Sequence, residues 1–76
     1  MTTQVFFNGS INAVQQFVSA AQKCPVHMEF ISEEFCANAK SLLDILCLDL
    51  SKNLTLRVDT DKDADVPAEL RPFFVQ

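Results

Sequence analysis

The sequence predicts a small α+β domain in which helices cover one face of an antiparallel sheet. Strand-like and helix-like patterns of apolar residues follow one another in the order β-α-β-β-α-β, with a short helix after them. The chain has 76 residues, of which 49% are hydrophobic, and seven residues are Phe. Because this length suits one domain and this composition supplies a core, we expect residues 1–76 to form a single domain.

The first half of the chain is predicted to form a strand and a helix. Residues 4–7 are apolar and end at Asn8-Gly9, a pattern typical of a strand followed by a turn. Ser10 or Asn12 is expected to cap the helix that follows. The apolar stripe of this helix, which we expect to face the core, consists of Ile11, Val14, Phe17, Val18 and Ala21.

Two further strands are predicted before the second helix. Pro25 prevents the first helix from continuing, and residues 26–31 then alternate between apolar and polar side chains. This alternation indicates a strand with one buried face. Residues 35–37 are predicted to form a short strand that pairs back onto it.

The second half of the chain begins with a helix signal. Ser41 stands three residues before Asp44, which matches a capping box and predicts a helix to about Leu48. Residues 54–58 alternate as a fourth strand, and the acidic residues 59–65 are expected to be exposed. In the tail, we expect Pro67 to begin a short helix and Pro72 to end it. Apolar side chains at 73–75 predict that the tail folds back onto the body.

Composition and charge exclude several classes of function. The net charge is −4, and no residue before Lys23 is charged, so nucleic-acid binding is not expected. The chain shows neither a signal peptide nor a membrane span, which favours a cytoplasmic location without membrane attachment. Three cysteines without a close pair predict small buried side chains rather than disulfides or a zinc site: Cys24, Cys36 and Cys47.

No motif for catalysis, a cofactor or a metal is found. His27 and Glu29 share one side of a predicted strand, which we interpret as an exposed sheet face, because a metal needs three or four ligands. Alternate aspartates in 59–65 are similar to the start of a calcium loop. The glycine and final glutamate that such a loop needs are replaced by Ala64 and Leu70. We therefore predict a protein that is not an enzyme and holds no cofactor or metal.

Two segments carry a resemblance to a known family. Residues 38–43 (Asn-Ala-Lys-Ser-Leu-Leu), followed by Leu-Asp-Leu at 48–50, resemble the segment around the regulatory serine of HPr. HPr is the histidine-containing phosphocarrier of the bacterial sugar phosphotransferase system. Residues 16–18 resemble part of its first helix at the matching distance, and the resemblance covers roughly residues 4–59. It implies an open-faced β-sandwich, a four-stranded antiparallel sheet covered on one face by two main helices and a short C-terminal helix.

The chain departs from this family at the residue that carries phosphate. The resemblance places Ser10 where HPr has its phosphoacceptor histidine and Asn12 where it has an arginine. A phosphoserine ester is stable, whereas a phosphohistidine passes its phosphoryl group on readily. The only histidine, His27, lies on a predicted strand. Carrier function by the mechanism of the family is therefore not expected.

The resemblance also implies a regulatory site. Ser41 matches the serine that a dedicated kinase phosphorylates in some bacteria, which creates a corepressor partner. Leu42, Leu43 and Leu46 match the apolar patch that docks partners. The structural alternative is that Ser41 is only a helix cap and that the leucines belong to the core. A phosphate at Ser41 would be favoured by the helix dipole.

Three functions remain open from the sequence. The first is a noncatalytic HPr-like regulatory or protein-interaction module with a phosphorylation switch at Ser41. Its protein partner would dock on Ser10, Asn12, Leu42, Leu43 and Leu46. The second is a divergent phosphocarrier that receives phosphate at Ser41 or His27. The third is a homo-oligomer assembled through the uncharged first helix; the sequence leaves the oligomeric state open.

Overall fold

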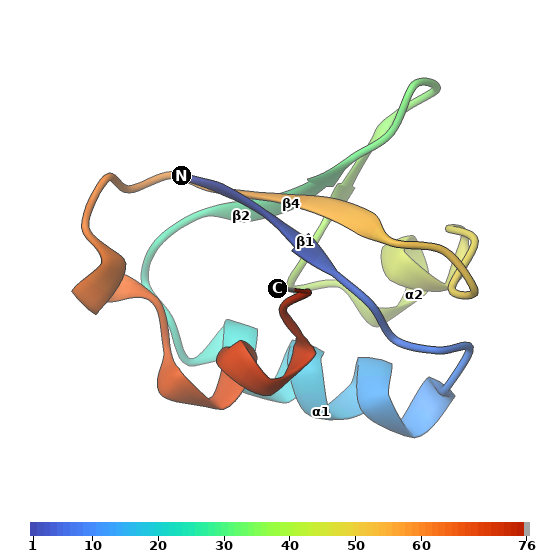
Figure 1. Cartoon of the computed structure of the whole chain (residues 1–76), viewed down its shortest axis with the longest axis horizontal. Coiled ribbons are helices and arrows are strands. Elements are labelled where there is room, and N and C mark those ends of the chain that lie inside the picture. The colour runs from blue at the N-terminus through green and yellow to red at the C-terminus, as the bar shows by residue number, and fades with distance from the viewer. Residues whose placement is uncertain (76) are drawn as a thin grey trace.

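A four-stranded antiparallel sheet forms one layer of the protein, and its helices lie together on one face of that sheet (Figure 1). The computed structural model describes residues 1–75. Its elements in chain order are β1 (Thr2–Val5), α1 (Ile11–Gln22), β2 (Met28–Ile31), β3 (Cys36–Asn38), α2 (Leu42–Leu46), β4 (Leu54–Val58) and two 3₁₀ helices, η1 (Asp63–Asp65) and η2 (Ala68–Phe73). This arrangement confirms the predicted fold class.

The strand order in the sheet is β1-β4-β2-β3. The last strand of the chain therefore lies between the first two, and β4 pairs antiparallel with both β1 and β2. The register places Leu56 opposite both Thr3 and Phe30, and Arg57 opposite both Thr2 and Glu29. Each cross-strand row thus has all its side chains on one face of the sheet.

One face of the sheet is apolar and the other is polar. On the helix-covered face, the buried side chains are Val5, Met28, Phe30, Ala37, Leu56 and Val58. On the open face lie Glu29, Arg57 and their neighbours in the same row, with no helix over them in Figure 1. The alternation predicted for β2 and β4 is therefore confirmed.

Helix α1 begins and ends where its sequence signals predict. Ser10 is the N-cap, and its Oγ accepts a hydrogen bond from the Ala13 N–H at 3.1 Å. The chain enters the helix through a turn in which Asn8 and Gly9 both have positive φ, of 53° and 70°. The helix ends at Gln22, before Pro25.

The predicted apolar stripe of α1 is buried except at its first residue. Val14, Phe17, Val18 and Ala21 belong to the core, whereas Ile11 is 54% exposed. The prediction that Ile11 faces the core is wrong. Ile11 lies at the edge of the stripe and in the first turn of α1, so the sheet does not cover it.

Four phenylalanines form the centre of the core. The rings of Phe7 and Phe17 contact each other, and each also contacts the rings of Phe30 and Phe73. The centroid distances are 5.4–5.9 Å, and most pairs are edge to face. Such aromatic pairs contribute about 0.5–1.5 kcal/mol each beyond the area they bury. The cluster joins the end of β1, α1, β2 and η2, and so it connects all layers of the fold.

The C-terminal tail folds back onto the body, as predicted, and the structure places it along the outer edge of β1. The N–H of Phe6 donates to the Phe73 carbonyl at 3.0 Å, and the N–H of Val75 donates to the Gln4 carbonyl at 2.8 Å. Phe74 forms an antiparallel bridge with Val5. The prediction that Pro72 ends the last helix is wrong, because Pro72 lies inside η2. A 3₁₀ helix this short tolerates the loss of one N–H donor.

Several predicted boundaries are shifted by contacts that are distant in the sequence. The first strand begins at Thr2 rather than residue 4, because the Met1 ammonium donates to the carbonyls of Val58 and Thr60 at 2.8 and 2.7 Å. The second strand is Met28–Ile31 rather than 26–31, and the third is Cys36–Asn38 rather than 35–37. Helix α2 ends at Leu46, because the Leu48 N–H closes a tight turn onto Ile45.

The three cysteines do not share one environment. Cys24 is buried, as predicted, whereas Cys36 and Cys47 are exposed, which corrects the expectation that all three pack in the core. Cys36 lies on the open face of the edge strand β3, and Cys47 follows the last residue of α2. Within residues 1–75, no helix is long and apolar enough to cross a membrane.

Candidate functional site

Ser41 caps α2, but only half of the predicted capping box forms. The Ser41 Oγ accepts a hydrogen bond from the Asp44 N–H at 3.4 Å. The Asp44 carboxylate does not return to the Ser41 N–H; it accepts from the backbone N–H of Asn38 at 3.2 Å. The Ser41 N–H donates to the Asn38 carbonyl at 3.0 Å. The start of α2 is therefore bonded to the edge strand β3 as well as to itself.

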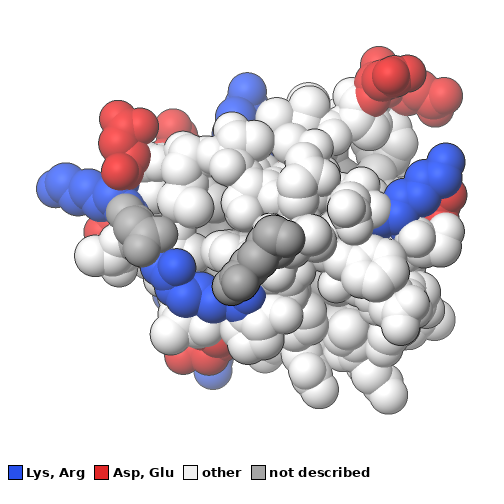
Figure 2. Space-filling view, viewed as in Figure 1, with Lys and Arg blue, Asp and Glu red and all other residues white. Residues whose placement is uncertain are grey.

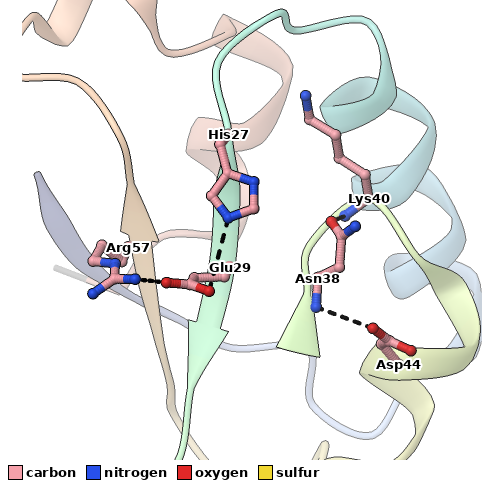
Figure 3. Close-up of polar contacts among 6 residues, drawn as sticks. All are labelled: His27, Glu29, Asn38, Lys40, Asp44 and Arg57. Carbon is pink, nitrogen blue, oxygen red and sulfur yellow. Dashed lines mark hydrogen bonds and ion pairs between the residues drawn. The ribbon is translucent and has the colours of Figure 1, made fainter. Parts of the chain in front are cut away.

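Lys40 ties the start of α2 to the end of α1. Its backbone N–H donates to the Asn38 side chain at 2.9 Å, and its ammonium donates to the Cys24 carbonyl at 2.5 Å. Its own carbonyl accepts from the Gln22 amide at 3.0 Å. Figure 3 shows Asn38 between Lys40 and Asp44. Ser41 is half-buried. The segment around it is hydrogen-bonded to Asn38 of β3, to Gln22 at the end of α1 and to Cys24 after α1.

The structure separates the two predicted parts of the site. The end of α1 lies beside Lys40, while the start of α1 lies beside the segment after α2, since the Gly9 N–H donates to the Leu50 carbonyl at 2.8 Å. Ser10 and Ser41 therefore lie at opposite ends of α1, which is about 18 Å long. Ser10 and Asn12 are exposed and are nearer the end of α2 than its start.

The predicted leucines divide between the core and the surface. Leu42 is half-buried and packs against the core, as the structural alternative requires. Leu43 is 76% exposed and Leu46 is 38% exposed. These two side chains are three residues apart, so they lie on the same side of α2. Ile45, between them, is fully buried and holds the helix on the core.

Ile11 adds to this surface, and the sequence analysis missed it because it assigned the residue to the core. It begins α1 at the end of the helix pair where Leu46 ends α2. No residue of α1 is charged, and Figure 2 shows an uncharged surface where the start of α1 lies. We call the exposed residues Ser10, Ile11, Leu43 and Leu46 the helical face. Asn12 faces another side of α1, where it lines a depression with Glu69 and Phe73 of η2.

His27 and Glu29 lie on the open face, where Glu29 forms an ion pair with Arg57 and His27 lies beside it. The Glu29 carboxylate contacts the Arg57 guanidinium directly across the sheet, and His27 Nε2 lies 3.8 Å from its other oxygen (Figure 3). His27 and Arg57 side chains are more than half exposed, so these pairs add little stability.

The remaining polar groups do not assemble a metal site in the part of the chain that the structure describes. Among the described side chains of residues 1–62 and 64–75, no three His, Cys, Asp or Glu come together. In the acidic segment, the Asp65 carboxylate accepts a hydrogen bond from the Thr60 hydroxyl at 2.8 Å. The pKa of Asp49 is lowered by hydrogen bonds from the Ser51 side chain and backbone, which favour the carboxylate form.

Comparison with known proteins adds no relative to this description. The chain matches no protein-family model, no curated protein and no solved structure. Function is therefore inferred from the geometry of the helical face and from the resemblance of residues 38–50.

Proposed function

We propose that this protein is a noncatalytic HPr-like interaction module that docks a protein partner on its helical face. The exposure of Leu43 carries the proposal, because a side chain that is 76% exposed removes little apolar surface from water in the fold. Ile11 at the start of α1 and Leu46 at the end of α2 are further exposed apolar side chains on the two helices. A partner with an uncharged, apolar docking surface fits the helical face best.

Phosphorylation of Ser41 is proposed as the switch. A phosphoryl group adds a charge of about −2 at pH 7 beside the otherwise uncharged Leu42 and Leu43. It would also stand in the same helical turn as the Asp44 carboxylate, which repels it, and next to Lys40, which attracts it. Modification therefore changes the charge of one edge of the helical face from neutral to negative and alters which partner binds.

The docking proposal predicts that Leu43→Ser with Leu46→Ser weakens partner binding at least tenfold, because exposed apolar anchors carry most interface energy. The partner would first be trapped with a photo-crosslinking amino acid at position 43 in cells of the source organism. It would then be purified, and its Kd for each variant measured by calorimetry. Circular dichroism would confirm that the double variant stays folded.

Val75→Ser is the matched control for this experiment. Val75 is 38% exposed, like Leu46, but it lies beside β1, away from the helical face. We expect the Val75→Ser variant to bind the partner with the same Kd as the unmodified protein. A folded double variant that binds the partner within twofold of the unmodified protein would contradict the proposal.

If Ser41 is the switch, the protein should carry phosphate at Ser41 after incubation with ATP and HPr kinase. It should carry no phosphate after incubation with phosphoenolpyruvate and the general phosphotransferase enzyme. Mass spectrometry of the intact and digested protein measures both reactions. Ser41→Ala is the control, and it should fold, because losing a helix cap costs only about 1 kcal/mol. An acid-labile label on His27 from phosphoenolpyruvate would instead support the divergent phosphocarrier.

A further inference from the structure

A second surface lies between the β2–β3 hairpin and the segment that links α2 to β4. Its chemistry differs from that of the helical face. It is a groove of about 560 Å³, within the range of ligand-binding pockets. Figure 1 shows the hairpin projecting away from the body of the protein on the side where that linking segment lies. Apolar side chains from both walls line the groove, namely Ile31, Phe35, Leu48 and Leu54.

The hairpin tip is held in shape by Ser32, although it contains neither Gly nor Asn. The Ser32 hydroxyl donates to the Phe35 carbonyl at 2.7 Å and accepts from the Phe35 N–H at 3.1 Å. The Ser32 N–H also donates to the Phe35 carbonyl at 3.0 Å. Phe35 is therefore presented to solvent, 41% exposed, from a closed turn that needs little ordering on binding.

The rim of the groove is acidic. Glu33 and Glu34 are exposed at the hairpin tip, and within residues 1–75 neither carboxylate has a cation partner. On the opposite wall, Asp49 lies 3.8 Å from the Lys52 ammonium, which largely offsets its charge. Figure 2 shows acidic side chains gathered at the upper right of the molecule, with no basic side chain among them. The uncompensated charge of the groove therefore belongs to the hairpin.

We propose that this groove binds a short basic segment of a protein partner that carries one or two large apolar side chains. An apolar side chain would enter between Phe35 and Leu48, and flanking Lys or Arg side chains would face Glu33 and Glu34. Charge complementarity at such a rim raises the association rate and rejects acidic segments. The groove shares no residue with the helical face, although Cys47 in its wall directly follows Leu46.

The test is a titration of the ¹⁵N-labelled protein with the hexapeptide Lys-Lys-Leu-Phe-Lys-Lys, followed by NMR at low salt. We expect chemical-shift changes at the amides of residues 31–35 and 47–54. The peptide Glu-Glu-Leu-Phe-Glu-Glu and the peptide Lys-Lys-Ser-Ser-Lys-Lys should each bind at least tenfold more weakly. Equal binding of the serine peptide would show charge attraction alone and would overturn the proposal.

Two variants locate the binding in the groove. Glu33→Gln with Glu34→Gln should raise the Kd about three- to tenfold, and Phe35→Ser should raise it by a similar factor. The matched control is Asp59→Asn with Asp61→Asn, which removes the same charge from an exposed loop and should leave the Kd within twofold. An equal rise in Kd for the control variant, or chemical-shift changes centred on residues 59–65, would overturn the proposal. The Leu43→Ser, Leu46→Ser variant should still bind the peptide.

Discussion

Phe17→Ala is expected to lower the free energy of unfolding by about 3–5 kcal/mol. Phe17 is fully buried on α1, and its ring contacts those of Phe7, Phe30 and Phe73. Removing it leaves a cavity where the strand layer, the helix layer and the tail meet. Because a domain of this size has a total stability of roughly 4–11 kcal/mol, a large fraction of the variant should be unfolded at 25 °C. Urea denaturation followed by circular dichroism measures the loss.

Phe6→Ala is the appropriate comparison for this variant. Phe6 neighbours Phe7 in the sequence, but its side chain is 38% exposed and takes no part in the ring cluster. We expect it to cost at most about 1.5 kcal/mol, because less apolar surface is lost from the interior. Equal losses for Phe6→Ala and Phe17→Ala would mean that the cluster is not the centre of the core.

Leu70→Ala is expected to cost about 2–5 kcal/mol, although the residue lies only six positions from the end of the chain. Leu70 is fully buried, and it fixes η2 against α1. Its loss therefore loosens the tail and with it the contact of Phe73 with Phe7 and Phe17. Thermal and urea unfolding measured on the same samples would give the size of the effect.

Leu43→Ala provides a control with identical chemistry. Leu43 is 76% exposed on α2, and Ala is the best helix-forming residue, so the change should be within about 0.5 kcal/mol. Comparing Leu43→Ala with Leu70→Ala separates the effect of burial on stability from the effect of side-chain type, since the same atoms are removed in both variants. A cost below 1 kcal/mol for Leu70→Ala would show that the tail is not part of the cooperative fold.

The sequence was sufficient for those parts of the fold that depend on local periodicity. Alternation at Met28–Ile31 and Leu54–Val58, and helical spacing from Val14 to Ala21, predicted which side chains face the core. Ser41 was correctly predicted as a cap, and of the two candidates for α1, Ser10 and Asn12, the structure selects Ser10. A cap can be predicted because it requires only the residues that follow it. These features use contacts within one turn or one strand.

The features that were missed depend on residues distant in the sequence. The Asp44 carboxylate bonds to Asn38 on another element rather than completing the capping box, and Ile11 is exposed because the sheet does not reach the first turn of α1. The groove beside Phe35 has walls from two segments that the sequence separates by α2. Periodicity contains no information on such juxtapositions, and so the helical face was only partly predicted and the groove was not predicted at all.

Both outer strands of the sheet have backbone groups occupied by other parts of the chain, which limits how copies of this protein can associate. The tail uses the outward Gln4 carbonyl of β1 and the N–H of Phe6, which follows β1. The start of α2 uses the outward N–H and carbonyl of Asn38 on β3. Strand addition and fibril growth need such groups to be free. At these positions the backbone is not available to pair with a strand of another molecule, which shortens the sheet edge open to polymerisation.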